Sequence, residues 1–142
     1  MALESIFEKL QAVCADAEIW WDSSPTLYKD WAQGFVESES SPRCESWRGQ
    51  LARLFNPDSP EKSLLRGVTT NPALISKCVL GQPEQWSYVA DQLISEAPYV
   101  GAETIFWRLY KQVILTGAQS FLPLWEQSDG RYGCISITSA IN

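Results

Sequence analysis

The sequence predicts an α/β fold that is built on a small parallel sheet. Three short segments rich in β-branched and aromatic residues (18–21, 66–69 and 134–137) are typical of strands, and each runs into polar residues. The stretches between them carry apolar residues at helical spacing. Strands that are separated by helices pair in parallel through right-handed crossovers. Two architectures fit this order: an open doubly wound sheet, or part of a (β/α)₈ barrel.

The N-terminal part predicts an amphipathic helix over about residues 3–15. Apolar side chains recur there at helical spacing, namely Leu3, Ile6, Phe7, Leu10 and Val13. The first strand then runs into Asp22, and Ser24 is suited to cap a helix that starts at Pro25. The inner face of this helix is predicted to hold Leu27, Trp31 and Phe35.

The rest of the chain predicts further helices between the second and third strands. In order, we expect an exposed polar loop over 37–46, a short helix over 47–55 that ends at Asn56-Pro57, the second strand, a helix from Asn71-Pro72, a helix from Pro83, a long helix from about residue 101, a turn at Asp129-Gly130 and the third strand. The sequence shows no internal repeat.

Composition excludes several classes of protein and of site. The 142 residues suffice for one domain, and the net charge of −6 without any basic cluster argues against nucleic-acid binding. No apolar run approaches the roughly 20 residues that span a bilayer. The four cysteines lie far apart, which predicts reduced thiols in a cytoplasmic protein. The absence of histidine excludes Ser-His-Asp and Cys-His catalysis and His-ligated metals.

The most informative motif is Gly-Val-Thr-Thr-Asn-Pro-Ala-Leu-Ile at 67–75. Taken alone, its Thr-Asn-Pro portion describes a helix start, in which Asn71 caps and Pro72 is the first helical residue. The whole string, however, resembles the second-strand signature of the transaldolase family. Residues 18–23 resemble that family's first strand, which ends in a functional Asp, and residues 130–138 resemble its third strand. The helix before the third strand resembles its counterpart in the longer bacterial transaldolases.

This resemblance implies an N-terminal βαβαβ portion of a (β/α)₈ TIM barrel of transaldolase type, incomplete as given. Residues 1–16 would form an N-terminal helix, and residues 17–142 a partial barrel with strands one to three. Transaldolases act in the pentose phosphate pathway, where they transfer a dihydroxyacetone unit between sugar phosphates. They use a lysine Schiff base and need neither a cofactor nor a metal.

The resemblance also assigns roles to residues at the strand ends. Asp22 matches the catalytic first-strand Asp. Thr69 or Thr70, together with Asn71, matches the second-strand polar pair that holds the substrate. A carboxylate beside an imine can shuttle protons when burial tunes its pKa, and a neutral amide can bind a substrate hydroxyl. Thr138 occupies the position of the third-strand Glu and is expected to contact substrate only, since a threonine hydroxyl is no general acid or base near neutral pH.

Two departures from the family decide what we expect of the isolated chain. Thr138 replaces the Glu, and none of the five lysines (Lys9, Lys29, Lys62, Lys77 and Lys111) falls in a predicted strand. We therefore expect the Schiff-base lysine in a downstream segment, and self-association or a completing chain to cover the open barrel. The alternative is a degenerate, inactive binding or assembly module. A third hypothesis is an unrelated small α/β domain that binds a phosphorylated metabolite.

Overall fold

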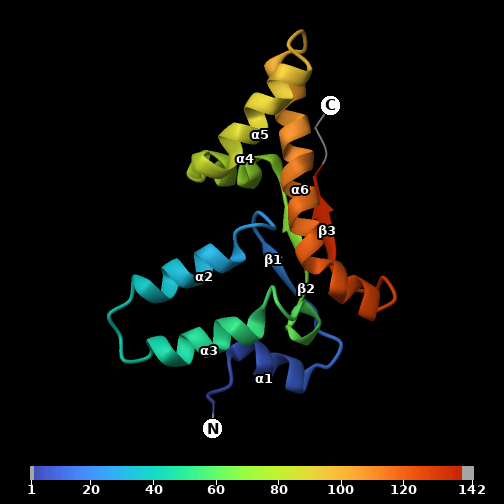
Figure 1. Ribbon diagram of the computed structural model, residues 1–142. Coiled ribbons are helices and arrows are strands. Elements are labelled where there is room, and N and C mark those ends of the chain that lie inside the picture. Colours follow the sequence, from blue (N-terminus) through green and yellow to red (C-terminus); the bar gives the residue numbers. More distant parts are fainter. Residues whose placement is uncertain (1, 139–142) are drawn as a thin grey trace.

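The computed structural model describes residues 2–138 and has the mixed α/β organisation that the sequence predicts (Figure 1). The three strands form one sheet in the order β1-β2-β3, and both pairs are parallel, as predicted. The elements are α1 (Ile6–Val13), β1 (Ile19–Asp22), α2 (Tyr28–Glu37), α3 (Cys44–Leu54), the short 3₁₀ helix η1 (Pro60–Lys62), β2 (Leu65–Thr70), α4 (Pro72–Gly81), α5 (Pro83–Glu96), α6 (Ala102–Gln127) and β3 (Cys134–Ile137).

The start of α2 corrects the predicted cap at Ser24. Residues 24–27 form a turn instead, in which the Leu27 N–H donates to the Ser24 carbonyl oxygen at 3.2 Å, and the helix begins only at Tyr28. Pro25 is buried because α6 has a glycine, Gly117, directly opposite it. The packing of Pro25 against α6 therefore holds residues 24–27 outside the helix.

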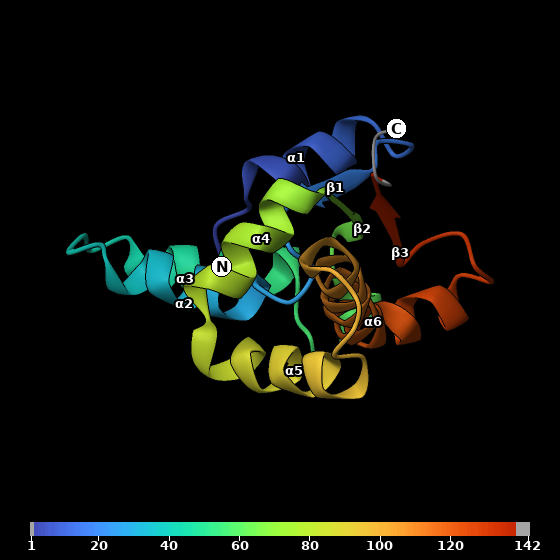
Figure 2. The same cartoon turned by 90° about the horizontal axis from the view of Figure 1, so that it is seen from above.

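The hydrophobic interior consists of two clusters. The first lies between the sheet and helices α2 and α6, and its buried members are Tyr28, Phe55, Leu65, Val68, Phe121 and Leu124. The second joins α4, α5 and α6 through Ile75, Trp86, Leu109, Tyr110 and Val113. Figure 1 shows α5 beside the upper half of α6, and Figure 2 shows both helices on the same side of the sheet. Helix α6 thus belongs to both clusters and connects the two halves of the molecule.

The two faces of the sheet have different surroundings. Val68 is fully buried against the first cluster, whereas the alternate positions of the strands are mostly exposed. We call these alternate positions the open face; its members are Trp20, Asp22, Gly67, Thr69, Cys134 and Ser136. A register shift between Ile19 and Trp20 in the pairing of β1 with β2 sets which residues face each way.

Helix α2 is rotated relative to the prediction. Its buried side chains are Tyr28 and Val36, whereas the predicted inner residues Trp31 and Phe35 are 44% and 41% exposed. The helix has two neighbouring apolar stripes, so periodicity alone could not choose between them. Tyr28 decides the rotation, because its hydroxyl donates to the carbonyl oxygen of Leu51 in α3 at 2.7 Å.

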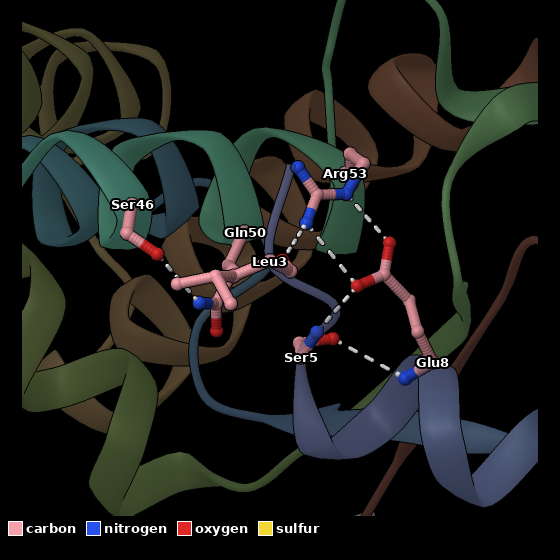
Figure 3. A network of polar contacts seen from close by, with 6 residues as sticks. All are labelled: Leu3, Ser5, Glu8, Ser46, Gln50 and Arg53. Atoms are coloured by element: carbon pink, nitrogen blue, oxygen red, sulfur yellow. Dashed lines mark hydrogen bonds and ion pairs between the residues drawn. The ribbon is translucent and has the colours of Figure 1, made fainter. Parts of the chain in front are cut away.

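Polar contacts hold helix α1 against α3, as Figure 3 shows. The Arg53 guanidinium donates from Nε to Glu8 Oε1 at 2.6 Å and from Nη2 to the Leu3 carbonyl oxygen at 2.7 Å. Ser5 and Glu8 form a reciprocal capping box at the helix start. No residue of α1 is buried, so the apolar stripe that predicted this helix faces mostly outward.

The contact between Glu8 and Arg53 should make the docking of α1 depend on pH. Hydrogen bonds from Arg53 and from the Ser5 backbone lower the pKa of Glu8 from 4.5 to about 2. A lowered folded-state pKa contributes stability above pH 4.5, and this contribution is lost as the pH falls from 4.5 towards 2. Because the pair is partly open to water, we expect it to contribute about 1–2 kcal/mol.

Urea unfolding at pH 6 and pH 3 measures this contribution. Between these conditions, the wild-type chain should lose about 1–2 kcal/mol more stability than Glu8→Gln, which has no carboxylate to protonate. Glu45→Gln is the matched control, because Glu45 meets Arg48 only at 3.6 Å on the exposed surface. Equal acid losses in wild type and Glu8→Gln would contradict the assigned ion pair.

Candidate functional site

The carboxyl ends of β1 and β2 bring an acid and a hydroxyl together on the open face. Asp22 and Thr69 are register partners, and the Thr69 hydroxyl donates to Asp22 Oδ1 at 2.9 Å. The Ser23 N–H also donates to the Thr69 carbonyl oxygen at 3.0 Å, which fixes the chain just beyond β1. Residues 47 positions apart in the sequence thus form one polar pair at the strand ends.

The two threonines of the Thr-Thr-Asn motif have opposite environments. Thr69 is half-buried on the open face, whereas Thr70 is 3% exposed and points to the other side of the sheet. The Thr70 hydroxyl has no hydrogen-bond partner among the described residues. The structure therefore brings Thr69, but not Thr70, together with Asp22.

Asn71 lies at the same end of β2 and starts α4. Its side-chain oxygen Oδ1 accepts from the Leu74 N–H at 3.0 Å, so Asn71 is the N-cap residue of that helix. A capping oxygen is committed to the backbone, but the side-chain NH₂ can still donate to a bound molecule. Pro72 occupies the first helical position, as the sequence predicts.

Thr138 directly follows β3 and is exposed. Its N–H donates to the Thr70 carbonyl oxygen at 3.3 Å, and its carbonyl oxygen accepts from the Tyr110 hydroxyl at 3.3 Å. Asp22 is exposed as well. Within residues 2–138 these strand ends therefore lie on an open surface, because no described element covers this face.

Two residues of the open face were missed by the motif comparison. Ser136 is the register partner of Thr69, so it extends the row of polar side chains onto β3. Trp20 lies across Gly67, where an added Cβ would collide with the indole ring, and its Nε1 donates to Glu18 Oε2 at 3.1 Å. Side chains two positions apart on a strand lie on the same face, so Ser136 and Trp20 could have been identified as the residues two positions before Thr138 and Asp22.

The loop after β1 is supported by two helices. Pro25 packs on Gly117 of α6, and the Thr26 hydroxyl lies 3.5 Å from the Cys78 sulfur of α4. Ser24 is completely buried, and its hydroxyl lies 3.2 Å from that of Thr26. These contacts hold the backbone that leaves Asp22, so the position of its carboxylate depends on tertiary packing.

The described lysines all lie away from the sheet. They belong to α1, α2, η1, α4 and α6, and each is exposed: Lys9, Lys29, Lys62, Lys77 and Lys111. Among residues 2–138, no cluster of three or more His, Cys, Asp or Glu could hold a metal ion. The helices of the same region are all too short or too polar to cross a bilayer.

Comparisons with known proteins identify no relative of this chain. No protein family, no curated protein and no solved structure matches the chain.

Proposed function

We propose that this chain contributes the first three strands of a transaldolase-like site that acts on sugar phosphates, with the Schiff-base lysine supplied by another segment. The observation that carries this proposal is the bonded pair of Asp22 and Thr69 at the ends of adjacent parallel strands. The carboxyl end of a parallel sheet is where α/β proteins place their reactive groups. In this proposal the sheet is part of a (β/α)₈ barrel.

The chemistry of the pair fits this role. Asp22 would relay protons during formation and breakdown of the imine, and the Thr69 hydroxyl would hold its carboxylate in one orientation. The Asn71 NH₂ and the Ser136 hydroxyl would bind hydroxyl groups of the substrate. Covering the open face would also remove water from Asp22, and this strengthens its electrostatic interactions.

Binding by the strand ends can be tested without the lysine. We expect fructose 6-phosphate to shift the backbone amide signals of Ser23, Thr69 and Asn71 in NMR titrations. Thr69→Val should raise the Kd obtained from these titrations at least about fivefold, because one hydrogen bond near a charge contributes about 1 kcal/mol or more. Thr70→Val is the matched control, since it removes a buried hydroxyl that has no partner in the described structure and should leave binding unchanged.

Two results would contradict the proposal. One is the absence of saturable shifts at the strand ends. The other is an equal response of the Thr69→Val and Thr70→Val variants. Glucose 6-phosphate in a parallel titration shows whether recognition depends on the keto sugar or on the phosphate alone.

The isolated chain should show no transaldolase turnover and no imine. A lysine attacks a carbonyl at neutral pH when burial disfavours its charged form, and all five lysines are exposed. Mass spectrometry after borohydride reduction with fructose 6-phosphate should therefore find no adduct. A dihydroxyacetone adduct on any of the five lysines would place the active site elsewhere.

A second candidate is a binding or assembly module without catalysis. The uncovered open face favours it, since Trp20 is 37% exposed and Cys134 and Ser136 on the same face are exposed as well. Sedimentation equilibrium would identify self-association. Self-association combined with no response to fructose 6-phosphate would favour this second function over the first.

A further inference from the structure

A groove of about 320 Å³ lies between α2, α3 and the loop that follows α3. This volume is in the range of small-molecule sites. The floor is aromatic: Tyr28 and Phe55 are each 3% exposed, and their rings meet edge to face at 5.2 Å. No lining residue belongs to the open face, so the groove is a separate site from the strand ends.

The walls of the groove are fixed by hydrogen bonds. The Tyr28 hydroxyl joins the two helices through the Leu51 carbonyl oxygen at 2.7 Å, and burial raises the pKa of Tyr28, so this donor keeps its proton. In the following loop, the Asn56 N–H donates to Ser63 Oγ at 2.9 Å and the Asp58 N–H donates to Asn56 Oδ1 at 3.0 Å. A preformed groove loses little conformational entropy when a ligand binds.

Two cations from different helices line this apolar groove. Lys29 comes from α2 and has no ion pair among the described residues, and Arg48 comes from α3. Arg48 meets Glu45 only at 3.6 Å on the exposed surface, where such a pair contributes little. Asp58 is the only carboxylate among the lining residues, which therefore carry one net positive charge in a chain of net charge −6.

We propose that this groove binds a small carboxylate whose apolar ring packs against the partly exposed Ala32 and Leu51. Its charge would lie between Lys29 and Arg48. The apolar lining favours a ligand with an apolar body, because binding removes the apolar surface of both from water. A guanidinium can bind a carboxylate through two parallel hydrogen bonds, and a lysine on the other wall adds a second charge. The Asn56 NH₂ can supply a further donor at the groove rim.

Phenylacetate is a suitable probe, with phenylacetamide as its neutral counterpart and inorganic phosphate as an anion without an apolar body. We expect phenylacetate to cause saturable NMR shifts at the amides of Ala32, Leu51 and Asn56. Its affinity should exceed that of phenylacetamide and of phosphate at least about tenfold, because charge-assisted bonds and ring burial each contribute about 1.4 kcal/mol or more.

Variants separate the two features of the site. The double variant Lys29→Gln/Arg48→Gln should weaken phenylacetate binding at least about tenfold, and Ala52→Leu, which fills the groove from the exposed side of α3, should abolish it. Lys62→Gln/Arg131→Gln is the matched control, because it removes the same charges outside the groove and should leave binding unchanged.

Three outcomes would overturn the proposal. The first is no saturable shift up to about 10 mM phenylacetate, since a ligand of this size should bind with a Kd no weaker than that. The second is equal binding of phenylacetamide or phosphate. The third is equal phenylacetate affinity of the groove double variant and its control. The dispersion of the NMR spectra of each variant verifies that the chain remains folded.

Discussion

Replacing Phe121 with alanine is expected to cost about 3–5 kcal/mol of unfolding free energy. Phe121 is 1% exposed, and its ring stacks on Phe55 with the centroids 4.6 Å apart. Through Phe121, α6 contacts Phe55, the residue that follows α3, and the rest of the first cluster. Truncation would leave a cavity that neighbours from three elements could not fill without moving apart.

Urea denaturation of Phe121→Ala measures this loss, and the neighbouring Leu122→Ala is its control. Leu122 lies on the same helix but is 48% exposed, so its truncation should change stability by no more than about 1 kcal/mol. Because a domain of this size is stabilised by only about 5–15 kcal/mol, Phe121→Ala could leave little folded protein at room temperature. A loss below 1.5 kcal/mol, about half of the expected minimum, would show that Phe121 is not a central contact of the first cluster.

The second large effect is that the same Gly→Ala substitution should change stability in opposite directions at two helical glycines. Alanine normally stabilises a helix interior over glycine by about 0.5–1 kcal/mol. Gly34 of α2 has no atom within 4 Å of an added Cβ, so Gly34→Ala should give this gain. At Gly117 of α6 the added Cβ would collide with the Pro25 ring, and we expect Gly117→Ala to lose about 1–3 kcal/mol instead.

Thermal and urea unfolding of the two variants in parallel decide this point. The Gly117→Ala variant should also shift the amide signals of Asp22 and Ser23, because Pro25 belongs to the loop that leaves β1. Gly34→Ala should leave these signals unchanged. A stabilised Gly117→Ala variant would mean that the loop does not pack on α6, and the support assigned to the Asp22 carboxylate would then be wrong.

The types of element and the parallel order of the strands could be predicted from local pattern. The second strand was expected over 66–69 and extends over Leu65–Thr70, and the turn at Asp129-Gly130 has the positive φ angles (52° and 78°) that these residue types favour. Asn71-Pro72 forms the predicted helix start. These features depend on residues near one another in the chain, so a single sequence contains the information.

Side-chain direction was harder to predict because it depends on distant partners. The apolar stripe that predicts α1 is mostly exposed, because Arg53 of α3 holds that helix by its polar side. Helix α2 is turned by the bond between Tyr28 and Leu51, so Trp31 is exposed. In both cases a contact between residues more than 20 positions apart overrides a local pattern.

For the candidate site, the sequence by itself determined which chemical groups follow each strand: a carboxylate, two hydroxyls with an amide, and another hydroxyl. It also required Thr69 and Thr70 to face opposite sides, because side chains alternate along a strand. Only the tertiary structure decided that Thr69 shares the open face with Asp22 and that Thr70 is buried. The physical reason is the register: one additional residue in β2 at the start of its pairing with β1 fixes which side chains meet across the sheet.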